Sequence, residues 1–146
     1  MVPTEAVKEI YLFRGASPED LAVVAAITER RDWLSGDVLY QAGEPADAMF
    51  HIEMGTIELA KPGAQVVFAT IGSGQTIGEI GFFQRGNRAG TATAREQTRA
   101  LRISYDKLTE LLSARPQLAL VVYRNAAAFL AGHFRQLALE RDQRYL

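Results

Sequence analysis

The chain contains no cysteine, so a disulfide framework and thiolate metal sites are both excluded. Histidine is nearly absent as well, since only His51 and His133 are present and they fall in different predicted elements. Barrel enzymes of the cupin type gather two or three histidines and a carboxylate around a metal. We therefore expect no metal centre. Because no serine, histidine and acid arrangement is visible either, we expect the protein not to be an enzyme.

Long apolar runs and an excess of charge are also missing. No run approaches the roughly 20 apolar residues that a membrane-spanning helix needs, and no basic start followed by an apolar stretch indicates a secretory signal. A cytoplasmic location fits this pattern. The formal net charge is −1, which argues against direct binding of nucleic acid. The C-terminal stretch is locally basic, and a solvated helix face explains that.

The composition, 48% hydrophobic and 23% charged, is that of a single globular domain over residues 1–146. We expect a helical region over 1–30, a barrel over about 31–103, and helices over 104–140. Ser17 followed by Pro18 predicts a helix start, because serine caps free N–H groups and proline is tolerated at the first position. Ser104 predicts a second cap, for a helix through Leu112. A long helix is expected from about Pro116 to Glu140.

Between the helices, short apolar runs alternate with turn residues, a pattern typical of a sandwich or barrel. The runs expected to form strands are Val38–Tyr40, Met49–Ile52, Thr56–Leu59, Val66–Ala69 and Leu101–Ile103.

The long helix carries an apolar seam with alternating spacings of three and four residues, as in coiled coils. Its members are Leu120, Tyr123, Ala127, Leu130, Phe134 and Leu137. The seam fits either packing against the barrel or a homodimer contact. Both are compatible, because a second apolar face is available on the same helix, at Leu118, Val121, Val122 and Phe129.

The glycine-rich loop over residues 77–94 holds the residues that indicate a function. Gly78 and Gly81 allow the backbone to approach a ligand closely. Free N–H groups at the start of one helical turn favour an anion, and Arg88 offers a fork of donors that matches phosphate oxygens. Glu79 is an acceptor suited to a sugar hydroxyl. Together these features indicate a ribose-phosphate site, although Glu79 and Arg88 could instead pair with each other.

The same loop resembles the phosphate-binding cassette of cyclic-nucleotide-binding domains. The matching residues are Gly78-Glu79-Ile80-Gly81-Phe82 and then Arg88-Ala89-Gly90-Thr91, with nine residues from Glu79 to Arg88. The Gly81-Phe82-Phe83 variant is similar to the sensor domains of the catabolite-activator and fumarate-nitrate regulator group. Other matching segments follow in the correct order over roughly residues 10–135, including Gly36–Pro45 and Met49–Ile57.

The resemblance implies a mainly β fold, an eight-stranded jelly-roll (double-stranded β-helix) barrel with N-terminal helices and a long C-terminal helix. It implies that Glu79 accepts from the ribose 2′-hydroxyl and that Arg88 pairs with the phosphate. Backbone N–H groups of Ile80, Gly81 and Ala89 would complete the cradle.

The resemblance further implies that the C-terminal helix closes over the base as a lid, with Tyr123, Phe129 and His133 as stacking candidates. Ala89 lacks the hydroxyl that often accompanies cyclic GMP selectivity, which favours cyclic AMP, while Thr91 could still supply a hydroxyl. Gly90 replaces an alanine of the family pattern, which would lower the rigidity of the loop.

Two functions are compatible with the sequence. One is a cyclic-nucleotide sensor, for cAMP or cGMP, that signals through its C-terminal helix. The other is a degenerate member of the family that serves as a ligand-independent interaction or dimerisation module. One long helix uses the residues after the barrel and leaves no room for a DNA-reading helix-turn-helix. A role in transcription would then require an unidentified protein partner or a longer chain.

Overall fold

The computed structural model describes residues 1–63 and 66–141. The helical segments are α1 (Thr4–Lys8), the 3-10 turn η1 (Tyr11–Phe13), α2 (Pro18–Ile27), α3 (Ile80–Phe83), α4 (Tyr105–Ala114) and α5 (Pro116–Arg141). The strands are β1 (Thr28–Trp33), β2 (Val38–Tyr40), β3 (Ala48–Met54), β4 (Ile57–Ala60), β5 (Val67–Ile71), β6 (Thr76–Ile77), β7 (Thr91–Ala94) and β8 (Thr98–Ser104). The fold is therefore mixed, with helices at both ends of the chain around a region of strands.

The eight strands form two antiparallel sheets of four strands each, in the orders β1-β8-β3-β6 and β2-β7-β4-β5. Within the described residues the two sheets share no strand, so the expected closed barrel is not formed. The reason lies at the sheet edges. Strand β6 is two residues long, and the positive φ of Gly78 (80°) then turns the chain out of the sheet.

The helix starts predicted from serine are confirmed. The Ser17 Oγ accepts a hydrogen bond from the Asp20 backbone N–H at 3.1 Å, and the Ser104 Oγ accepts one from Lys107 at 3.3 Å. The N-terminal helical region ends earlier than expected, because β1 begins at Thr28 and pairs along its whole length with β8. Cross-strand pairing with β8 outweighs the helical spacing of this stretch.

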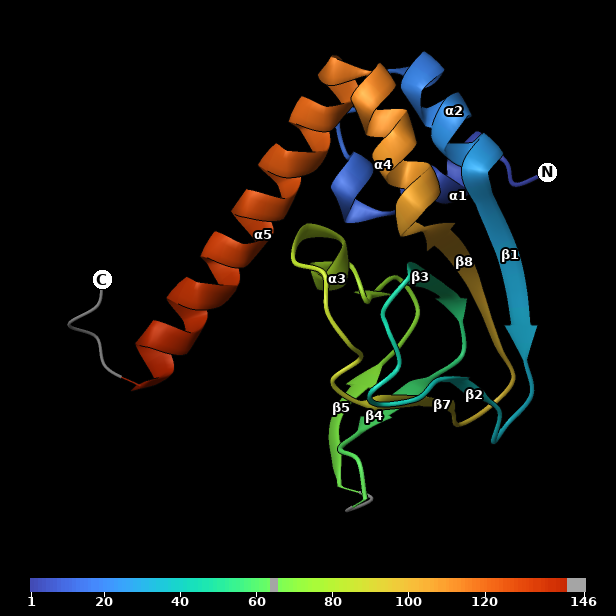
Figure 1. Cartoon of the computed structure of the whole chain (residues 1–146), viewed down its shortest axis with the longest axis vertical. Helices are drawn as coiled ribbons and strands as arrows, with labels where there is room; N and C mark the ends of the chain where they lie inside the picture. Colours follow the sequence, from blue (N-terminus) through green and yellow to red (C-terminus); the bar gives the residue numbers. More distant parts are fainter. Residues whose placement is uncertain (64–65, 142–146) are drawn as a thin grey trace.

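The buried apolar side chains form two clusters. One lies where the helices cover one end of the sheets, and it includes Phe13, Leu108 and Tyr105. The other fills the space between the two sheets and includes Phe50, Ile52 and Ile57. Figure 1 shows α1, α2 and α4 gathered together, while α5 begins beside one end of α4 and runs away from them.

The first half of α5 packs against the body of the domain, whereas most of the second half is exposed. Leu118, Val122 and Ala126 are buried, whereas every residue from 127 to 137 is exposed. The Asn125 Nδ2 donates to the carbonyl oxygens of Leu12 and Arg14, at 2.9 Å each. These two bonds attach α5 to the η1 turn.

We expect Asn125→Ala to lower the free energy of unfolding by about 1–2 kcal/mol, because two carbonyl groups lose their donor. Alanine has the higher helix propensity, so propensity alone would change stability in the opposite direction. Urea denaturation of the two proteins measures the difference. Gln117→Ala, an exposed position on the same helix, is the control. Equal stability of Asn125→Ala and the parent would show that the amide does not hold the helix.

Candidate functional site

The glycine-rich loop leaves β6 at Gly78, forms the single turn α3, and returns to β7 at Thr91. Two of its glycines are required by close contacts. A Cβ atom at Gly78 would lie 2.8 Å from the Arg88 Nη1 and 3.1 Å from the carbonyl oxygen of Ala48. A Cβ atom at Gly81 would lie 2.5 Å from the Tyr105 hydroxyl oxygen. The loop therefore packs tightly around the arginine and the tyrosine.

Arg88 is 7% exposed and has several partners. Its Nη2 donates to the carbonyl oxygen of Ala48 at 2.8 Å and lies 3.5 Å from the Asp47 Oδ1. The guanidinium carbon lies 4.0 Å from the centre of the Tyr40 ring, in a cation–π arrangement. The Arg88 backbone N–H also donates to the backbone carbonyl oxygen of Glu44 at 2.7 Å. The side chain is thus held in one position before any ligand arrives.

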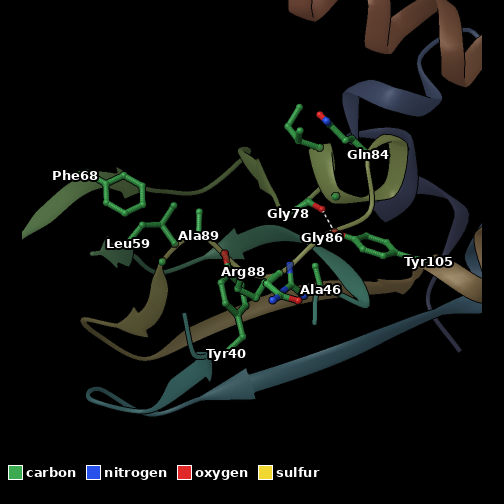
Figure 2. A pocket seen from close by; sticks show the side chains of 14 residues that line it. Tyr40, Ala46, Leu59, Phe68, Gly78, Gln84, Gly86, Arg88, Ala89 and Tyr105 are labelled. Atoms are coloured by element: carbon green, nitrogen blue, oxygen red, sulfur yellow. Dashed lines mark hydrogen bonds between the residues drawn. The ribbon is translucent and has the colours of Figure 1, made fainter. Parts of the chain in front are cut away.

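A pocket of about 270 Å³ opens beside this guanidinium. Figure 2 shows the apolar side chains of Leu59 and Phe68 toward one end, Gly78 and Tyr105 toward the other, and Arg88 between them. The remaining lining residues are Tyr40, Ala46, Ile80, Gly81, Gln84, Gly86, Asn87, Ala89 and Gly90. The pocket therefore places one strong cationic donor next to an apolar wall.

Most of the predicted ligand-binding residues line this pocket, and two do not. Those that line it are Gly78, Ile80, Gly81, Arg88 and Ala89. Thr91 lies on β7, where its Oγ1 accepts from the backbone N–H of Ala42 at 3.1 Å and faces a different hollow. Glu79 also lies outside the pocket, and it does not pair with Arg88.

Glu79 is 6% exposed, and its carboxylate accepts a hydrogen bond from the Tyr11 hydroxyl at 3.0 Å. Burial raises the pKa of Glu79, and hydrogen bonds from its own backbone N–H and from the Tyr11 hydroxyl partly oppose this shift. The side chain lines a second cavity of about 500 Å³, between η1, the start of β6 and α5. Arg14, Asn125 and Phe129 also line this cavity.

Tyr40, Leu59, Phe68 and Tyr105 line the pocket and were not among the residues predicted from the sequence. They lie on β2, β4, β5 and at the start of α4, far from the loop in sequence, so no local motif indicates them. The Tyr105 hydroxyl donates to the Gly78 carbonyl oxygen. Gly90 has a clear role here, because a Cβ atom at this position would lie 2.8 Å from the Phe68 ring.

The aromatic residues expected to stack on a base do not reach this pocket. Tyr123 packs edge-on against Phe83 with ring centres 5.6 Å apart. Phe129 stacks on Tyr11 at 4.6 Å, and His133 lies 6.4 Å from Phe129. All three lie on α5, and no residue of this helix lines the pocket.

The described part of the chain contains no group of three or more histidine, aspartate or glutamate side chains placed to hold a metal ion. Over the same ranges, 1–63 and 66–141, no helix combines the length and apolarity that a membrane span requires.

We expect Gly78→Ala to lower the free energy of unfolding by about 1–3 kcal/mol, since a side chain is strained at its positive φ and meets the Arg88 guanidinium. Gly86→Ala is the matched control in the same loop, with no atom within 4 Å of the added Cβ. It should change stability by no more than about 0.5 kcal/mol. Thermal and urea unfolding measure both variants. Equal effects would contradict the close packing around Arg88.

A family model described as the cyclic nucleotide-binding domain matches residues 30–115. The Cyclic AMP receptor protein of Thermus thermophilus is 28% identical over 134 residues, which are 90% of this chain and 60% of that protein. An uncharacterized NTE family protein of Mycobacterium bovis is 29% identical over 125 residues, 86% of this chain and 21% of that protein. The chain thus spans less than two thirds of either curated relative.

Among solved structures, the N-terminal domain of a transcriptional regulator from Streptomyces coelicolor superposes with a TM-score of 0.76. The two chains are 26% identical, and the match covers 84% of this chain and 90% of the other. The expected family is confirmed. Because the family model matches more than half of the sequence, the chain belongs to the cyclic nucleotide-binding domain family, a family of regulatory ligand-binding domains and not of enzymes.

Proposed function

We propose that this domain is a sensor that binds a cyclic nucleotide, with cAMP preferred over cGMP, in the pocket beside Arg88. The observation that supports it best is the composition of that pocket. One buried guanidinium and two closely packed glycines stand next to an apolar wall, and a cyclic nucleotide carries a phosphate next to an apolar base.

The phosphate binds at the end of the pocket formed by Arg88, Gly78 and Gly81. The hydrogen bond to the Ala48 carbonyl oxygen fixes the guanidinium, so little entropy is lost when an anion pairs with it. Asp47 is a weak competitor, because its carboxylate is 73% exposed and lies 3.5 Å from Arg88. A phosphate oxygen replaces this longer contact with a charge-assisted hydrogen bond.

The base packs at the opposite end, against Leu59 and Phe68. Phe68 is 48% exposed in this structure, so a base that covers its ring buries apolar surface. Ala89 presents no hydroxyl to the pocket, which favours adenine over guanine. Gly90 leaves the space that the Phe68 ring occupies.

The signal leaves the domain through α5. The exposed half of this helix carries apolar side chains that nothing in the described structure covers, among them Leu130, Phe134 and Leu137. We propose that a second copy of the chain covers them, because the residues follow the seam spacing of a two-helix contact. A ligand changes this contact only by binding the two arrangements of α5 with different affinity.

A ligand-independent interaction module is the second candidate. It is favoured by the internal partners of the two charged cassette residues, since Arg88 already bonds Ala48 and Glu79 already bonds Tyr11. In that case the loop is held by protein contacts alone, and α5 is the functional surface.

Calorimetric titration with cAMP and cGMP separates the two candidates. We expect one-site binding that favours cAMP, and we expect Arg88→Lys to weaken it by about 10- to 100-fold, because lysine lacks the two-pronged geometry. We choose lysine because it keeps a donor for the Ala48 carbonyl oxygen, whereas Arg88→Ala would leave that oxygen without its partner. Arg99→Lys, on the exposed face of β8, is the control. Absence of heat with either ligand, together with an unchanged melting temperature, would support the ligand-independent module.

The dimer is tested by Phe134→Glu, which replaces an apolar residue that is 64% exposed with a charged one. We expect the parent chain to sediment as a dimer and this variant as a monomer, because a buried unpaired charge is costly. Gln136→Glu adds the same charge to another exposed position of α5 and should leave the dimer intact. A monomeric parent at all concentrations would contradict the proposed contact.

A further inference from the structure

Among the described residues, Tyr11 is the one other residue that donates a hydrogen bond to the Glu79 side chain. This bond directs the carboxylate into the cavity under α5 and away from the pocket that holds Arg88. Glu79 therefore lies on the boundary between the two cavities. Its backbone belongs to the loop that forms one, and its carboxylate faces the other.

Tyr11 contacts the helix as well as the loop. Its ring stacks on Phe129 of α5, with centres 4.6 Å apart and planes 27° apart. The η1 turn to which it belongs is attached to the same helix through Asn125. One side chain thus connects the ligand loop, by its hydroxyl, with α5, by its ring.

A buried carboxylate needs a hydrogen-bond donor, because an ionised group without one is strongly destabilised away from water. Tyr11 supplies that donor here. Burial and the neighbouring carboxylate both raise the pKa of Tyr11, so the hydroxyl retains its proton and donates. The bond uses the Oε2 atom and turns the carboxylate into the second cavity, so a ligand hydroxyl in the Arg88 pocket reaches Glu79 only when the side chain turns and gives up its bond to Tyr11.

We infer that Tyr11 is a positioning residue that competes with the ligand for Glu79 and so joins ligand binding to the position of α5. This inference rests on the proposed function. Without ligand, Tyr11 holds the carboxylate out of the binding pocket. When a ribose 2′-hydroxyl donates to the Glu79 carboxylate instead, the Tyr11 hydroxyl loses its acceptor. The stack of the Tyr11 ring on Phe129 is then free to rearrange.

The test compares cAMP with 2′-deoxy-cAMP, which lacks the hydroxyl that would engage Glu79. In Tyr11→Phe we expect the affinity for cAMP to rise about 5- to 10-fold, because the competing hydrogen bond is gone. The affinity for 2′-deoxy-cAMP should stay within about twofold, since that ligand does not use the carboxylate. The phenylalanine ring keeps the stack on Phe129, so the fold is retained. Tyr123→Phe, which removes an exposed hydroxyl on α5, should alter neither affinity.

An equal change with both ligands, or no change with either, would overturn the competition. If the parent chain binds neither nucleotide, the proposed function fails, and a ligand-free measurement still tests the role of Tyr11. Carbon-13 NMR titration of the Glu79 carboxyl should then show its pKa higher in Tyr11→Phe than in the parent or in Tyr123→Phe. An identical titration in all three proteins would show that Tyr11 does not hold the carboxylate.

Discussion

A guanidinium group buried below a protein surface must find acceptors, and Arg88 finds its main one in the Ala48 carbonyl oxygen, 2.8 Å away at the start of β3. Much of the loop geometry follows from that bond. Gly78 has no room for a side chain because the guanidinium lies against it, and the Tyr40 ring stacks on the same group. The loop is therefore shaped around a cation that is already in place, which suits the binding of an anion.

The two charged residues of the cassette differ in their readiness for a ligand. Arg88 lines the pocket proposed to bind the phosphate, whereas Glu79 is directed into the neighbouring cavity by Tyr11. Both groups are buried, and each has a hydrogen-bond partner within the protein. Ligand binding in such a site is an exchange of partners, so its free energy depends on the internal contacts that are given up.

Helix α5 differs from the rest of the fold because it is supported along only part of its length. Its first half is buried against α4 and η1, and its second half presents apolar side chains to solvent. A helix of this kind is held in place by few contacts, among them Asn125 and the Tyr11–Phe129 stack. These contacts lie beside Glu79, so a change at the loop and a change in the helix involve the same residues.

Local signals in the sequence were sufficient for the helix caps at Ser17 and Ser104, most of the strands, the long helix and the glycine-rich loop, because each depends on neighbouring residues. The sequence by itself also determined the family, through motif residues in a recognisable order. Only the tertiary structure decided which side chains share a cavity. Phe68 and Tyr105 approach Arg88 from distant elements, and the direction of Glu79 is set by Tyr11, 68 residues away. Such contacts arise from long-range packing, which no local spacing encodes.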